Sequence, residues 1–171
     1  MAFRAEIDDF AAFYASAYQR AFRTARAIVG DAASADDVTQ DAFVAAYRTR
    51  DRFRGDAPAE AWLMRIVVNR AISLTRRRRI VWTEPLDAEA RSPDDVPERV
   101  AGRVSLLSAL GRLPADQRAA IVLRYYLDYD YATIARVLDT RVGTVGSWLH
   151  RGLAALAIAL GEPSEPAGGT G

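Results

Sequence analysis

The chain has 171 residues, half of them hydrophobic, and a formal net charge of +1. This length allows one domain or two small ones, and the near-neutral charge excludes binding to nucleic acid through bulk charge alone. The sequence holds no cysteine and one histidine, which excludes disulfides, thiolate nucleophiles and cysteine- or histidine-rich metal sites. Acidic residues near the N-terminus and the lack of a long apolar run predict a cytoplasmic protein without a membrane segment.

Two helices are predicted in the first fifty residues. Apolar residues recur every three or four positions over residues 7–28, and Gly30 should end that helix. Ser34 followed by Asp37 has the pattern of a capping box, so a second helix is expected to begin at Ser34. Its polar face would carry Asp37, Gln40 and Asp41, an acidic surface that suits solvent or a protein partner rather than DNA.

A third helix is predicted over residues 59–79, after a loop over residues 52–58. It holds six arginines and no acid beyond Leu63, a local positive field that the net charge hides. With Trp62 and Asn69, these cations suit single-stranded nucleic acid, because they add a stacking surface and an amide to the charge. A solvated helix end and a core tryptophan are the alternative. The arginines are Arg65, Arg70, Arg76, Arg77, Arg78 and Arg79.

The composition changes after the third helix. Residues 84–99 contain three prolines and six acids against two arginines, so they predict an exposed, flexible linker. The second half of the chain is predicted to hold four helices. One ends at Gly111, and the next begins at Pro114. The buried side of the helix that begins at Pro114 is expected to include Ile121, Val122 and Tyr125.

Residues 131–152 have the pattern of a helix-turn-helix. Val142, Val145 and Leu149 recur at helical spacing and should form the buried face of its second helix, which Thr140 can cap. Two helices this short bury little alone, and a helix held out in this way fits the major groove of DNA. A plain helical hairpin is the alternative. The other faces carry Arg141, Thr144, Ser147, His150 and Arg151.

Residues 33–79 resemble region 2 of the extracytoplasmic-function (ECF) group of bacterial RNA polymerase sigma factors, in the sigma-70 family, and residues 113–156 resemble their region 4. The order of these blocks and the acidic linker also match. The resemblance implies an all-α fold of two small domains, a three-helix domain and a four-helix domain with a helix-turn-helix, joined by the flexible linker. The expected divisions are residues 1–80, a linker over 81–97, residues 98–160 and a disordered tail over 161–171.

The resemblance also implies the function. Such a protein binds core RNA polymerase, directs it to specific promoters and assists promoter opening, without catalysis, cofactor or metal of its own. Its partners would be core polymerase, promoter DNA and, as is common in the family, an anti-sigma factor. The free protein is expected to be a monomer in the cytoplasm.

Three other functions compete with this interpretation. An enzyme would need a phosphate-binding glycine loop, a metal cluster or a catalytic triad, and the sequence has none of these patterns. A plain helix-turn-helix regulator would leave the first half unexplained. A degenerate sigma-like protein, which binds polymerase or a regulator without selecting promoters, is favoured by a cation-poor recognition helix with Gly146 and Gly152.

The family's contact residues map onto this sequence as follows. The acidic helix would bind polymerase through Asp37, Gln40 and Asp41. The loop and the third helix would hold the melted strand of the −10 element through Arg52, Phe53, Arg54, Gly55, Asp56, Trp62, Arg65, Asn69, Arg70, Arg76 and Arg77. The last helix would read the −35 element through Arg141, Thr144, Ser147, Trp148 and Arg151.

Overall fold

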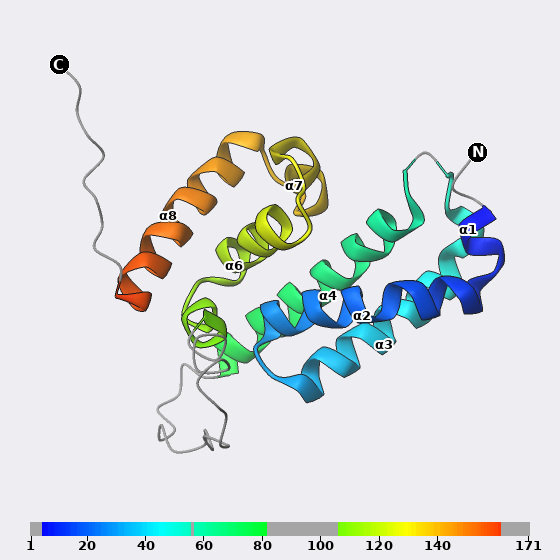
Figure 1. Cartoon of the computed structure of the whole chain (residues 1–171), viewed down its shortest axis with the longest axis horizontal. Coiled ribbons are helices and arrows are strands. Elements are labelled where there is room, and N and C mark those ends of the chain that lie inside the picture. Colours follow the sequence, from blue (N-terminus) through cyan, green and yellow to red (C-terminus); the bar gives the residue numbers. More distant parts are fainter. Residues whose placement is uncertain (1–4, 56, 82–105, 162–171) are drawn as a thin grey trace.

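The structure, a computed structural model, describes residues 5–55, 57–81 and 106–161. Every regular element within these ranges is helical, as the sequence predicts (Figure 1). Residues 5–81 are called the first half below and residues 106–161 the second half. The expectations for the linker and for the C-terminal tail fall largely outside the described residues.

The first half is built from three long helices. They are α2 (Phe10–Val29), α3 (Ala32–Thr49) and α4 (Ala59–Val81), preceded by the single turn α1 (Ala5–Asp8). A short 3₁₀ turn, η1 (Arg50–Arg52), follows α3. Gly30 ends α2 as predicted, because its φ of 93° lies in the left-handed region and its N–H bonds to the Arg26 carbonyl.

The start of α3 differs from the prediction. Asp31, not Ser34, caps the helix, because its carboxylate accepts a hydrogen bond of 2.8 Å from the Ser34 N–H. Ser34 therefore occupies the third helical position and is buried. Its hydroxyl accepts a hydrogen bond from Arg78 of α4, so it ties α3 to α4 instead of starting the helix.

The second half begins with a helical segment over residues 106–111 and continues with α6 (Ala115–Ile121). At its end α6 widens into the π-helical turn η2 (Val122–Tyr126), where the Leu127 N–H bonds to the Val122 carbonyl. The prediction that Tyr125 is buried is wrong, since its side chain is 62% exposed. The wider turn rotates Tyr125 outward, while Leu123 is fully buried.

The helix-turn-helix consists of α7 (Tyr131–Val137) and α8 (Val142–Leu160). Val145 and Leu149 are buried as predicted, but Val142 is 49% exposed. Val142 is the first residue of α8 and borders a surface hollow beside α7, which leaves its side chain uncovered. Thr140 does not cap α8, because the helix begins one residue later, after Arg141, and has no side-chain cap.

The two halves share one contiguous apolar core. The helix α6 lies alongside α4 and α2, and α8 covers α6 and α7 on the outer side (Figure 1). The core therefore runs from α3 through α2 and α4 into the second half. Within the described ranges, no helix is both long and apolar enough to cross a bilayer.

Candidate nucleic-acid and protein interfaces

The acidic face of α3 is exposed. Asp37, Gln40 and Asp41 all point to solvent. The Gln40 amide donates a hydrogen bond of 2.8 Å to Asp36, which also accepts a hydrogen bond of 2.6 Å from the Tyr18 hydroxyl. The bond to Asp36, with burial, raises the pKa of Tyr18 to about 12. This chain of hydrogen bonds fixes the position of Gln40 on the face.

An apolar surface adjoins the acidic face. Val44 and Tyr47 of α3 are about half exposed, as is Tyr14 of α2, whose ring lies 4.6 Å from the ring of Phe43. Arg50 lies over the Tyr47 ring, 3.9 Å from its centroid. The α2–α3 surface therefore offers carboxylates beside aromatic rings, which suits a protein partner that presents basic and apolar residues.

The loop between α3 and α4 divides into exposed and buried residues. Arg52 and Arg54 are exposed, whereas Phe53 is 4% exposed and its ring lies 5.2 Å from that of Trp62. Gly55 has a φ of 71°, a backbone conformation that favours glycine. Trp62 is half-buried and packs against the core, so the Phe53 and Trp62 rings connect the loop to the core. Asp56 lies outside the described residues.

The arginines of α4 fall into two groups. Arg65 and Arg77 are exposed, as is Asn69, and neither arginine has an ion pair among the described residues. Arg70 lies 3.8 Å from Asp41 of α3, and Arg76 lies 2.5 Å from Asp116 of α6. The arginine surface is thus partly neutralised by acids of neighbouring helices. The side chain of Arg79 is outside the described residues.

The third paired arginine, Arg78, links α4 to the start of α3. It lies 2.8 Å from Asp31 and also bonds to the Ser34 hydroxyl. Burial opposes ionisation of Asp31, but the hydrogen bonds from Arg78 and Ser34 outweigh it and lower the pKa of Asp31 to about 2. Arg78 therefore acts as a structural cation.

The predicted −35 surface lies on α8. Arg141, Ser147 and Arg151 are exposed, together with His150, whereas Thr144 is half-buried. Trp148 is also half-buried and packs against the core. The Arg151 Nε donates a hydrogen bond of 3.3 Å to the Ser147 carbonyl one turn earlier.

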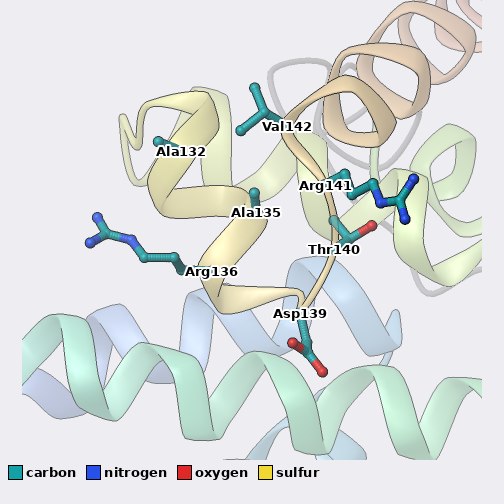
Figure 2. A pocket seen from close by; sticks show the side chains of 7 residues that line it. All are labelled: Ala132, Ala135, Arg136, Asp139, Thr140, Arg141 and Val142. Carbon is teal, nitrogen blue, oxygen red and sulfur yellow. The ribbon is translucent and has the colours of Figure 1, made fainter.

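A hollow of about 690 Å³ lies at the turn between α7 and α8 (Figure 2). Arg136 and Arg141 both line it but point to opposite sides, so they do not converge on one ligand. Asp130 caps α7 by accepting the Thr133 N–H at 2.6 Å. Hydrogen bonds from Thr133 lower the pKa of Asp130. Among the residues described, no group of His, Cys, Asp or Glu side chains could hold a metal ion.

Sequence reasoning missed Arg118 of α6. This side chain is 5% exposed, and burial lowers its pKa. Its guanidinium donates hydrogen bonds to carbonyls of Ile28, Gly111 and Leu113. Its spacing of three and four residues from Ile121 and Val122 places it on the buried stripe of α6, which was the available signal.

Comparison with known proteins agrees with this architecture. The family model described as "Sigma-70 region 2" matches residues 13–80, and the one described as "Sigma-70, region 4" matches residues 103–156. The chain is 38% identical over 144 residues to the ECF RNA polymerase sigma factor SigM of Mycobacterium tuberculosis. That alignment covers 84% of this chain and 73% of SigM.

Two solved structures have a similar fold. One is the sigma factor RpoE in complex with the anti-sigma factor NepR from Bartonella quintana, with 24% identity and a TM-score of 0.70, covering 90% of this chain and 97% of RpoE. The other is CnrH in complex with the cytosolic domain of CnrY, with 29% identity and a TM-score of 0.68, covering 94% of this chain and 98% of CnrH.

These matches define the class of protein. The fold and the two matched regions are those of the sigma-70 family, whose members are transcription initiation factors. Within that family, the chain belongs to the ECF group of RNA polymerase sigma factors.

Proposed function

We propose that this protein binds core RNA polymerase through α3, holds the melted −10 strand on α4 and its preceding loop, and contacts the −35 element with α8. The main support is that both sigma regions occur in one chain and that each offers exposed side chains for its contact. In this proposed role, the protein acts in the cytoplasm as a binding factor and performs no catalysis of its own. Residues 1–80 and 98–160 are its two functional domains.

For polymerase binding, the proposed contacts are Asp37, Gln40 and Asp41. Their charge and exposure support this role, as does the hydrogen-bond chain that fixes Gln40. The adjoining aromatic surface adds apolar area, which a stable interface needs at its centre.

For promoter opening, the proposed contacts are Asn69 with Arg65 and Arg77. These three are exposed on one helix, and neither arginine is held by an ion pair within the described ranges. The Asn69 amide can donate and accept hydrogen bonds at once, so it can recognise the edge of an unstacked base. Arg52 and Arg54 extend this positive surface into the loop.

An anti-sigma factor is a further proposed partner. RpoE and CnrH, whose folds are similar to that of this chain, were each solved in complex with a second protein, NepR and the cytosolic domain of CnrY respectively. A regulator of this kind would bind the same exposed surfaces that serve polymerase or DNA.

The test is reconstitution with core polymerase. The double variant Asp37→Arg with Asp41→Arg should bind core polymerase at least tenfold more weakly, because two carboxylates of the contact surface become cations. The matched control is Asp8→Arg with Asp51→Arg, which makes the same charge change at two other exposed acids of the first half. Equal binding by the two double variants would exclude the acidic face as the contact.

A degenerate sigma-like protein is the second candidate. The observation in its favour is the recognition helix, whose exposed cationic side chains are Arg151 and, at the cap position, Arg141. Sequencing of DNA bound by the reconstituted holoenzyme separates the two functions. A recurrent promoter pattern supports promoter selection, and unselective DNA supports the degenerate protein.

A further inference from the structure

The Asp36 carboxylate of α3 is held from two sides. Its Oδ1 accepts a hydrogen bond of 2.6 Å from the Tyr18 hydroxyl of α2, and its Oδ2 accepts one of 2.8 Å from the Gln40 side-chain nitrogen, one turn further along α3. Asp36 is half-buried where α2 and α3 lie side by side (Figure 1). Both carboxylate oxygens therefore have a partner within the protein, and the Gln40 amide is one of these partners.

These bonds decide which way the Gln40 amide is turned. A carboxylate can only accept hydrogen bonds, so the group that faces Asp36 must be the NH₂ end of the amide. The carbonyl oxygen of Gln40 is then left on the side away from Asp36, and the side chain is exposed. A glutamine without such a bond could offer either end to a partner. Here the exposed face offers three acceptors, which are the Gln40 carbonyl and the carboxylates of Asp37 and Asp41.

The Tyr18 hydroxyl is a fixed donor. Its ring packs against the core, 6.3 Å from the Phe22 ring and 6.3 Å from the Phe43 ring, and is stacked on both at interplanar angles of 14° and 22°. The bond to Asp36, with burial, raises the pKa of Tyr18 to about 12, so the hydroxyl keeps its proton in neutral solution. Aromatic packing thus sets the position of the hydroxyl that holds Asp36, and Asp36 in turn holds Gln40.

Asp41, a second acceptor of the face, is held less firmly. Its carboxylate lies 3.8 Å from Arg70 of α4, beyond hydrogen-bond distance, and its side chain is 71% exposed. Ordering an exposed side chain in an interface costs conformational entropy, and a side chain that already has its bound orientation avoids this cost. Gln40, unlike Asp41, therefore has its orientation set before a partner arrives.

We propose that Tyr18 and Asp36 are positioning residues for the proposed contact with core polymerase. They hold the Gln40 amide so that its carbonyl oxygen, and not its NH₂ group, meets the partner. The face then selects a surface rich in N–H donors, such as arginine or lysine side chains. Neither Tyr18 nor Asp36 needs to touch the partner itself. The inference rests on the proposed function, because the gain in affinity arises only when polymerase binds this face of α3.

A double-mutant cycle on binding to core polymerase tests the role of Tyr18. Tyr18→Phe removes the hydroxyl and keeps the packed ring, so the protein should remain folded and bind about threefold to tenfold more weakly. Tyr125→Phe is the matched control, with the same change at an exposed tyrosine of the second half. In a Gln40→Ala background, Tyr18→Phe should cause no further loss, because its effect passes through Gln40. A merely structural role of the hydroxyl would weaken binding by the same factor in both backgrounds.

Exchange of donor and acceptor between positions 36 and 40 provides a rescue. Asp36→Asn alone leaves two amides facing each other, so the orientation of Gln40 is no longer fixed and binding should weaken as in Tyr18→Phe. The double variant Asp36→Asn with Gln40→Glu places the NH₂ donor at position 36 and the acceptor at position 40, and it should restore binding to near the wild-type level. Gln40→Glu alone is the control for the added carboxylate. It should bind more weakly than the double variant, because two carboxylates then face each other.

The positioning can also be measured in the free chain. The side-chain N–H groups of Gln40 give their own signals in nitrogen–proton NMR spectra, and the relaxation of these signals reports motion on the ps–ns timescale. In the wild type the Gln40 amide should show restricted motion. Tyr18→Phe should increase this motion, whereas Tyr125→Phe should leave it unchanged.

Two results would overturn the inference. One is equal binding to core polymerase by Tyr18→Phe and Tyr125→Phe, and the other is an equal loss from Tyr18→Phe with and without the Gln40 side chain. A freely moving Gln40 amide in the wild type would refute the positioning even if polymerase binds this face. The proposed function fails differently, since the variant Asp37→Arg with Asp41→Arg would then bind core polymerase as its control does. A restricted Gln40 amide would in that case show a hydrogen-bond chain that serves no polymerase contact.

Discussion

Gly152 of α8 lies so close to Ile121 of α6 that a β-carbon at position 152 would stand 2.7 Å from the Ile121 Cδ1. Gly152 is itself buried. Glycine weakens a helix, but here it leaves room for the Ile121 side chain against the backbone of α8, and a side chain at position 152 would force that side chain to move. The structure thereby gives a packing reason for a glycine that the sequence alone presents as a weakness in the recognition helix.

Gly152→Ala should destabilise the protein by about 1 kcal/mol, because overpacking outweighs the gain in helix propensity. Gly146→Ala is the control, since its β-carbon would stand 3.8 Å from Tyr131, an ordinary contact. That variant should be stabilised by up to about 1 kcal/mol. Urea unfolding of both variants provides the measurement, and equal stabilisation would show that the Ile121 side chain moves aside without cost.

Arg77 and Arg78 should have different roles although they are adjacent. Arg77→Ala should leave the free energy of unfolding unchanged. If Arg77 contacts phosphate, the variant should also reduce, by about one unit, the slope of the logarithm of the promoter-binding constant against the logarithm of the salt concentration. Arg78→Ala should lower stability by about 1 kcal/mol, because Asp31 and Ser34 lose their partner. Binding titrations at several salt concentrations, together with thermal unfolding, distinguish the two. A salt effect confined to Arg78→Ala would contradict this division.

Asp31 should make stability depend on pH in acid. The pKa of Asp31 is about 2 in the folded protein, below its ordinary value of 3.8, so the folded state favours the charged form of the carboxyl group. The contribution is complete above pH 3.8 and is lost as the pH falls through about 2. Asp31→Asn should remove this component, so that its stability declines less than that of the wild type between pH 4 and 2. Unfolding of both proteins is measured at each pH in this range. If the stabilities of the wild type and of Asp31→Asn decline equally, the result counts against the Asp31–Arg78 pair.

Asn69→Ala should impair opening and spare binding. Closed-complex formation should stay largely intact, while strand opening falls and preference at one −10 position relaxes by roughly 1–3 kcal/mol. A pre-melted template should recover much of the opening but not the preference. Permanganate footprinting on duplex and bubble templates measures both effects.

Arg151→Ala is expected to fail at an earlier step. Arg151 is exposed on α8, so its loss should weaken closed-complex formation, and a pre-melted −10 bubble should not restore the −35 contact. Gel shifts of the holoenzyme on bubble templates with and without a −35 element test this. Identical defects in the Asn69 and Arg151 variants would refute the assignment of contacts while leaving the family unaffected.

Local sequence signals predicted the helices well. Gly30 ends α2 and residue 59 begins α4 as expected, because a left-handed cap and a proline-bounded loop are local features. The error at the start of α3 has a local and a distant cause. Asp31, only three residues before Ser34, provides the cap, and the Ser34 hydroxyl accepts a hydrogen bond from Arg78, which lies 44 residues away.

The candidate interfaces show the same limit. The exposure of Asp37 and Asn69 follows from helical periodicity, whereas the burial of Arg118 depends on the end of α2. Likewise, periodicity cannot tell which arginines of α4 are neutralised, because Asp116 meets Arg76 across the contact between the halves. Local patterns therefore predict which face a side chain occupies, and tertiary contacts decide its partner.

The π-helical turn η2 ends α6 with one residue more than a regular helical turn contains. It closes one bond between the Leu127 N–H and the Val122 carbonyl, five residues apart, where an α-helix spans four. Removing one residue from Val122–Tyr126 would remove the wide turn and let α6 continue as a regular helix. Such a deletion would shorten the connection between α6 and α7 while leaving every side chain of α8 unchanged. The way in which the helix-turn-helix joins α6 is therefore set by the number of residues in this turn, and not only by their identity.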